Sequence, residues 1–307
     1  MDIFLQQIVN GLVLGSIYAL VALGYTMVYG IMGLINFAHG EVVMIGALTA
    51  LSVVQLLAGS GLPGPLVALL GLAAAIPVCM AIGYTIEKVA YRPLRGAPRL
   101  APLITAIGVS IVLQNLAMMI WGRSYHAFPS VLPEGQHELL GASFTDLQVL
   151  IVLVAGIMMG GLLLLINRTR LGRAMRATAE NPAIAQLMGV NVNHIISLTF
   201  VIGSALAAVA GLMVAANYSI AHYYMGFILG LKAFTAAVLG GIGNLAGAML
   251  GGILLGLIES LGAGYIGDLT GGFLGSNYQD VFAFFVLILV LVFRPSGLVG
   301  EKVAERA

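Results

Sequence analysis

Long apolar runs, each close to the length of a membrane span, follow one another along this chain. Nine of them cover residues 8–30, 42–58, 66–87, 100–121, 147–167, 192–217, 225–242, 245–266 and 280–294. A transmembrane helix needs about 20 mostly apolar residues, and hydrocarbon offers no partner to an unpaired backbone group, so such runs fold as helices. We therefore expect an all-α, polytopic integral membrane helical bundle of about 8–10 transmembrane helices, forming a single domain over residues 1–307.

The composition agrees with lipid as the solvent. Only 8% of the 307 residues are charged and 60% are hydrophobic, whereas a soluble domain carries about 25% charged residues. The net charge of +1 gives no indication of nucleic acid binding. The first apolar run follows no basic segment and contains no small-residue cleavage site, so we expect a retained membrane helix and not a signal peptide.

Basic residues gather in three clusters, and cytoplasmic loops collect Lys and Arg. We expect all three clusters to face the cytoplasm, because the nine spans place an even number of crossings between them. This count puts the N-terminus and the long loop 122–146 outside and the C-terminus inside. The clusters are Lys88, Arg92, Arg95 and Arg99; Arg168, Arg170, Arg173 and Arg176; and Arg294, Lys302 and Arg306.

The second of these clusters opens a loop, at about residues 168–191, that contains signals for a short helix. Asn181 is a good N-cap, and Pro182 suits the first helical position because its missing N–H costs nothing there. Gly189 suits the left-handed position after a helix. We expect a helix from about Pro182 to Met188, with one face that carries Ile184, Leu187 and Met188.

That apolar face on a basic loop allows two interpretations. The helix either packs on the protein's own cytoplasmic surface or inserts into a groove of another protein, as helix-in-groove contacts do. The residue pattern favours neither of the two.

Two charged residues lie inside apolar runs, where a charge costs about 2.5–3.5 kcal/mol on insertion scales and is by default a functional candidate. Lys232 and Glu259 each lie seven residues from the outer end of their runs, which is about 10 Å deep at 1.5 Å per residue. We expect them to form an ion pair that faces the interior of the bundle. The alternative is that Lys232 reaches the outer interface while Glu259 borders a water-filled space.

A polar group interrupts the chain between the first two runs: Asn36, His39 and Glu41, around Gly40. One interpretation is a broken helix that lines a substrate path, where freed backbone groups and polar side chains meet substrate or water. The other is an ordinary turn in which Asn36 acts as a cap. No histidine pair has metal-ligand spacing, and no catalytic motif with a nucleophile and a base occurs, so we expect neither a metal site nor enzymatic activity.

Several segments together resemble the permease subunits of high-affinity branched-chain amino acid ATP-binding-cassette importers. They are INFAHGEVVMIGA (Ile35 to Ala47), EKVAYRPLRG (Glu87 to Gly96), LITAIGVSIVLQN (Leu103 to Asn115), TFVIGSALAAVAG (Thr199 to Gly211) and KAFTAAVLGGIGN (Lys232 to Asn244). The wider importer family docks its ATPase through Glu-Ala-Ala, three residues and Gly. Ala183, Ile184, Ala185 and Gly189 match that spacing, but the glutamate is missing, so the sequence does not support a specific salt bridge there.

The resemblance implies an inward transporter of leucine, isoleucine and valine in the bacterial inner membrane, with the stretch Asn181, Pro182, Ile184, Leu187, Met188 and Gly189 as its ATPase docking helix. It moves the interpretation of Asn36, His39 and Glu41 towards the path. No G-x-x-x-x-G-K-[ST] phosphate loop occurs, so ATP would bind to partner subunits and this chain would bind no cofactor. The implied partners are two ATP-binding subunits, a second homologous permease and an extracytoplasmic binding protein. The alternatives are a permease for urea or short amides, and a stand-alone channel or secondary carrier.

Overall fold

The computed structural model of the chain describes residues 2–98, 100–133, 135–139, 141–271 and 278–300. Arg99, Lys302 and Arg306 of the basic clusters lie outside the described residues. The nine predicted spans correspond to nine helices: α1 Asp2–Met32, α2 His39–Leu56, α3 Gly64–Thr85, α4 Leu100–Trp121, α5 Asp146–Arg168, α8 Val192–Tyr218, α9 Met225–Gly240, α10 Leu245–Leu269 and α11 Gln279–Phe293.

Seven of the helices in the described residues are long and apolar enough to cross a bilayer. The other two apolar helices, α9 and α11, have 16 and 15 residues. The prediction of a polytopic all-α membrane bundle is confirmed.

The remaining elements are short. The π-helix η1 (Ile86–Tyr91) and the 3₁₀-helix η2 (Arg92–Leu94) follow α3, while α6 (Arg170–Glu180) and α7 (Pro182–Leu187) follow α5. Strands β1 (His126–Ala127) and β4 (Ile220–Ala221) form one antiparallel pair, in which His126 faces Ala221. Strands β2 (Gln136–Leu139) and β3 (Ala142–Thr145) form the other, in which Gln136 faces Thr145.

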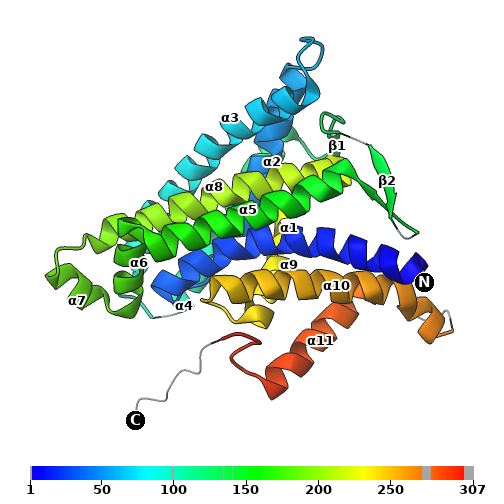
Figure 1. Cartoon of the computed structure of the whole chain (residues 1–307). Coiled ribbons are helices and arrows are strands. Elements are labelled where there is room, and N and C mark those ends of the chain that lie inside the picture. Colours follow the sequence, from blue (N-terminus) through cyan, green and yellow to red (C-terminus); the bar gives the residue numbers. More distant parts are fainter. Residues whose placement is uncertain (1, 99, 134, 140, 272–277, 301–307) are drawn as a thin grey trace. The chain divides into compact units, whose positions relative to one another are not determined.

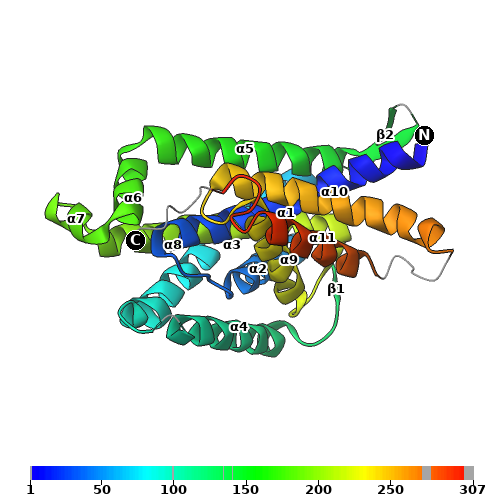
Figure 2. The same cartoon turned by 90° about the horizontal axis from the view of Figure 1, so that it is seen from below.

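The chain divides into two compact units, which we describe separately. The first contains the described residues within 1–26, 134–159 and 232–307. Its helices α1 and α10 run side by side (Figures 1 and 2) and approach backbone to backbone at glycines. A Cβ on Gly15 would lie 2.6 Å from the Cα of Ile253, and one on Gly252 would lie 2.6 Å from the backbone nitrogen of Ala19. Small residues of this kind let membrane helices pack without intervening side chains.

The second unit contains the described residues within 27–133 and 160–231, and its core is built from α2, α3 and α8 (Figure 2). Here too glycines allow close approach, since a Cβ on Gly46 would lie 2.8 Å from the Cα of Ala208. By contrast, α4 leaves many large apolar side chains exposed, among them Ile104, Ile111 and Met119. A helix in a bilayer can leave such side chains to lipid or to a partner helix.

The break between α1 and α2 belongs to this second unit. Gly33 ends α1 in the left-handed region, with φ +62°, and its N–H donates to the carbonyl of Tyr29 at 2.7 Å. This is the ordinary way in which glycine stops a helix. The chain then runs without helical structure to His39, where α2 begins, so the predicted interruption is present.

Candidate functional site

The short helix predicted in the basic loop is α7, and its two end signals act as expected. The Oδ1 of Asn181 accepts hydrogen bonds from the N–H groups of Ala183 and Ile184 at 3.0 and 3.1 Å. Pro182 is the first helical residue, and Gly189 has φ +86°. The helix ends at Leu187, one residue earlier than predicted. The prediction of a capped helix in this loop is confirmed.

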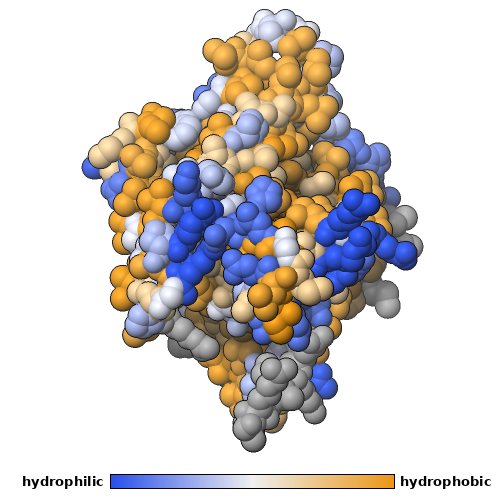
Figure 3. Space-filling view, turned by 90° about the vertical axis from the view of Figure 1, so that its left-hand side faces the viewer, coloured by the Kyte–Doolittle hydropathy of each residue, from blue (hydrophilic) through white to orange (hydrophobic). Residues whose placement is uncertain are grey.

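The apolar face of α7 points away from the described part of the chain. The residues Ile184, Leu187 and Met188 are 58%, 87% and 80% exposed, whereas Ala185 on the inner side is buried. Figure 3 looks onto the end of the molecule that carries α7 in Figure 1, and there hydrophobic patches lie directly beside hydrophilic ones. These three side chains are therefore largely free of contacts with the described part of the chain.

The sequence analysis missed α6, the helix before α7. Its signal was available, because Thr169 is an N-cap whose Oγ1 accepts from the N–H of Gly172 at 3.0 Å. The arginines of this segment were interpreted only as part of a basic cluster, and the helical pattern among them was not recognised. As a result, the loop is a pair of helices, α6 and α7, which leads into α8.

The ion pair predicted between Lys232 and Glu259 is present in the first unit. The Nζ of Lys232 contacts Oε1 of Glu259, and the Glu259 side chain is 1% exposed. The helices α9 and α10 therefore bring the two charges together, as their equal depth predicted.

Two further residues that the sequence analysis missed complete this cluster. The Oδ1 of Asp280 in α11 lies 2.8 Å from the same Nζ of Lys232. Tyr18 in α1 donates its hydroxyl to Oε2 of Glu259 at 2.6 Å, and its ring centroid lies 5.7 Å from the ammonium. Four helices thus each contribute one group, and the Lys232 ammonium offsets part of the negative charge of two carboxylates whose desolvation would otherwise be costly.

The three polar residues around Gly40 are buried in the second unit. The Oδ1 of Asn36 accepts a hydrogen bond from the N–H of Ala38 at 3.2 Å, and the carbonyl of Asn36 accepts one from the N–H of His39 at 3.0 Å. The turn in which Asn36 organises the backbone is therefore present.

Glu41, in the first turn of α2, ties that helix to α4. Its Oε1 accepts from Ser110 Oγ at 3.0 Å and from Gln114 Nε2 at 2.7 Å. Its other oxygen, Oε2, is buried and has no hydrogen-bond partner in the described part of the chain. A buried carboxyl oxygen without a partner costs free energy. Glu41 is therefore a candidate for contact with the polar part of a transported substrate.

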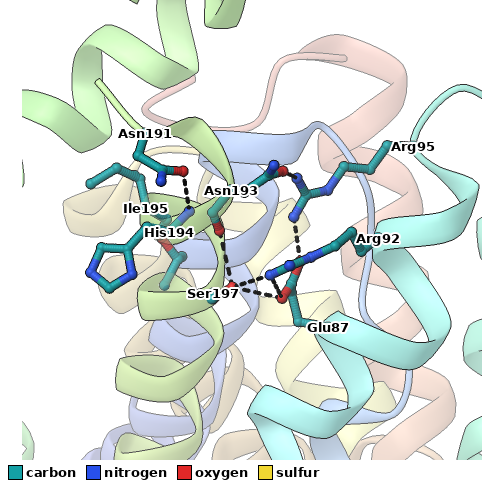
Figure 4. Close-up of polar contacts among 9 residues, drawn as sticks. Glu87, Arg92, Arg95, Asn191, Asn193, His194, Ile195 and Ser197 are labelled. Atoms are coloured by element: carbon teal, nitrogen blue, oxygen red, sulfur yellow. Dashed lines mark hydrogen bonds and ion pairs between the residues drawn. The ribbon is translucent and has the colours of Figure 1, made fainter. Parts of the chain in front are cut away.

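A second buried carboxylate, Glu87, lies at the start of η1 and accepts several charged donors (Figure 4). Arg92 donates from Nε to Oε1 at 3.2 Å and from Nη2 to Oε2 at 2.9 Å. Arg95 forms a second ion pair with Oε1. The hydroxyl of Ser197, in α8, lies 2.7 Å from Oε2. The sequence analysis placed Arg92 and Arg95 in a basic cluster that faces the cytoplasm and did not predict that they converge on one carboxylate.

The described residues contain no group of three His, Cys, Asp or Glu side chains that could hold a metal ion. Long apolar helices, an ion-pair cluster between apolar helices and an exposed apolar helix beside basic residues define a polytopic helical membrane protein.

Comparison with known proteins gives the particular family. The family described as "Branched-chain amino acid transport system / permease component" matches residues 7–291, and the chain belongs to it. The high-affinity branched-chain amino acid transport system permease protein BraD of Pseudomonas aeruginosa is 53% identical, over 99% of this chain and 98% of that one. The corresponding LivH of Escherichia coli is 46% identical, over 99% and 97%. A probable branched-chain amino acid transport permease protein LivH of Methanocaldococcus jannaschii is 28% identical, over 97% and 94%.

Proposed function

We propose that this chain is the membrane-spanning permease subunit of an ATP-driven importer for leucine, isoleucine and valine. The relatives that match over nearly their whole length are named as permeases for branched-chain amino acids. The single observation that carries the ATP-driven part is α7, a capped helix whose apolar face is exposed on a basic loop. A channel or carrier that works alone would have no use for such a face.

The proposed partners follow from what the chain lacks and what it offers. Its sequence contains no phosphate-binding loop, so ATP binds to two separate subunits that receive α7 in a groove. The basic clusters, the C-terminus and α7 then face the cytoplasm of a bacterial inner membrane. A second homologous permease completes the membrane part, and an extracytoplasmic binding protein delivers and selects the substrate.

Transport would proceed by alternating access, with α7 passing the closure of the ATP-binding subunits to the membrane helices. Branched-chain amino acids combine a zwitterionic backbone with an apolar side chain, so a path for them needs mostly apolar walls and a few polar groups. In the second unit the proposed contacts are Asn36, His39 and Glu41; in the first they are Lys232 and Glu259.

The test of this function is reconstitution of the chain in proteoliposomes with candidate ATP-binding subunits, the second permease and the binding protein. We expect leucine uptake that requires ATP and is reduced by competing isoleucine or valine. Uptake that proceeds equally well without ATP would refute the proposal. If urea or short amides compete and branched-chain amino acids do not, the cargo assignment is wrong and the transport class stands.

A narrower test addresses docking. Leu187→Asp places a charge at the most exposed apolar position of α7, and we expect the ATP-binding subunits to stop co-purifying. Leu62→Asp is the matched control, because Leu62 is also exposed but lies between α2 and α3, on the opposite side in the proposed topology. Full co-purification of the Leu187→Asp protein would show that this face does not dock.

A further inference from the structure

The segment η1, between α3 and the basic loop that follows it, has an unusual backbone. Residues Ile86–Tyr91 wind as a π-helix, a form that is rare and is frequently found at functional sites. Both Glu87 and Tyr91 in this segment are buried. The contacts of these two side chains lead in different directions within the second unit.

The Glu87 side of η1 reaches the beginning of α8. Arg92 Nη2 donates both to Glu87 Oε2 and to Ser197 Oγ, at 2.9 and 2.7 Å. Arg95 joins Glu87 to the side chain of Asn193, one turn earlier in α8 (Figure 4). Two guanidinium groups and one carboxylate thereby fix η1 and η2 to the first two turns of α8, through charge-assisted hydrogen bonds of the strong kind.

These turns of α8 follow directly on α7. Only four residues, 188–191, separate the two helices, and the connection is tightly hydrogen-bonded. The N–H of Val190 donates to the carbonyl of Ala185 at 3.0 Å, and Asn191 caps α8 by accepting from the N–H of His194 at 3.1 Å. These hydrogen bonds hold α7 directly to the start of α8, the part of that helix that contains Ser197.

The Tyr91 side of η1 reaches the break between α1 and α2. The hydroxyl of Tyr91 lies 3.2 Å from the carbonyl oxygen of Ile35 and 3.2 Å from Oδ1 of Asn36. The same Oδ1 accepts from the N–H of Ala38, immediately before α2. The ring of Tyr91 packs on that of Phe200 in α8, with centroids 5.3 Å apart. The segment η1 thus lies in direct contact with both α8 and the break.

We propose that η1 links the docking loop to the break at residues 33–38, with Glu87, Arg92 and Tyr91 as positioning residues for coupling. When α7 and the start of α8 move, the ion pairs at Glu87 carry η1 with them, and Tyr91 shifts the turn that Asn36 organises. This inference rests on the proposed ATP-driven function, and it adds the route by which that energy reaches a candidate path residue.

The experiment measures leucine imported per ATP hydrolysed by the reconstituted complex. The variants are Tyr91→Phe and Ser197→Ala, each of which removes a single hydroxyl and leaves the docking face intact. We expect ATP hydrolysis and co-purification to persist while leucine imported per ATP falls about fivefold, the size that corresponds to one lost hydrogen bond. The matched control is Tyr125→Phe, which deletes a hydroxyl from an exposed tyrosine between α4 and β1 and leaves the ratio unchanged.

The double variant Tyr91→Phe/Ser197→Ala separates a link from two independent defects. Residues in series lose no more together than the worse single change, whereas independent sites multiply their losses. Multiplied losses, an unchanged ratio, or a loss of hydrolysis in parallel with uptake each overturn the link. Uptake independent of ATP in the unchanged protein overturns the proposed function and the link with it, whereas an unchanged ratio in variants of an ATP-driven protein overturns the link alone.

Discussion

Removal of the Lys232 ammonium tests the charge cluster of the first unit most directly. In Lys232→Met the carboxylate of Glu259, which is 1% exposed, loses its counter-ion and keeps the hydroxyl of Tyr18 as a hydrogen-bond donor. The neighbouring Asp280 becomes a like charge without its counter-ion. Breaking a buried ion pair from one side costs about 3–5 kcal/mol. We expect about 3 kcal/mol in the free energy of unfolding, at the lower end of this range, because the Asp280 side chain is 44% exposed.

The Glu259→Gln variant and the double variant lose less free energy of unfolding than Lys232→Met. In Glu259→Gln, Lys232 still has Asp280 at 2.8 Å, so the expected loss is about 1 kcal/mol, that of one net hydrogen bond. In the double variant Lys232→Met/Glu259→Gln the nearly fully buried carboxylate of Glu259 is also removed, and only the part-exposed Asp280 lacks its counter-ion, so most of the stability lost in Lys232→Met returns. The double variant is thus more stable than Lys232→Met alone.

The assay is chemical unfolding in detergent followed by circular dichroism, with leucine uptake as a second measurement. Lys88→Met serves as the control, since Lys88 is exposed and surface substitutions change stability by about 0.5 kcal/mol or less. Equal or greater instability of the double variant, compared with Lys232→Met, would refute the reasoning. Normal uptake by Glu259→Ala, with Lys232→Ala and the double Ala variant equally impaired, would show that the pair has no joint role in transport.

Three further predictions concern local structure. Asn181→Ala removes the cap of α7, at a cost of about 1 kcal/mol, so amide exchange in that helix accelerates about fivefold; unchanged exchange contradicts the capping role. Gly252→Val places carbon atoms against the backbone of Ala19 and lowers the free energy of unfolding by about 3 kcal/mol, whereas Gly156→Val, which meets open space, does not; similar losses refute close packing. Burial lowers the pKa of His222 below its ordinary value of about 6.5, so the neutral ring contributes stability that is lost as the pH falls below that value; an NMR titration midpoint above it disproves this sign.

Much of the fold was predictable because the bilayer leaves the backbone few choices. Nine apolar runs became nine helices, since a buried backbone in hydrocarbon must satisfy its own hydrogen bonds. The helix α7 was predictable from Asn181, Pro182 and Gly189, whose roles depend on local backbone geometry. The contact between Lys232 and Glu259 was predicted from their equal depth, their opposite sign and their places on neighbouring helices, because an unpaired charge is costly inside a membrane.

What escaped prediction depends on contacts between segments distant in sequence. Asp280 stands at the end of an apolar run and resembles an ordinary interface residue until α11 brings it to Lys232. Glu87 precedes a basic cluster, and nothing in the local sequence shows that the hydroxyl of Ser197, 110 residues later, forms a hydrogen bond with its carboxylate. The π-helical backbone of η1 likewise has no local signature in this chain.

The contact between α1 and α10 has a consequence for attempts to build chimaeras of such proteins. Because Gly15 and Gly252 lie directly against the main chain of the neighbouring helix, each of these helices is shaped to one particular neighbour. A donor segment that brings even one extra methyl group would find no space to occupy. Exchange of α1 between relatives should therefore succeed only when α10 travels with it, so that the two helices are inherited as a pair.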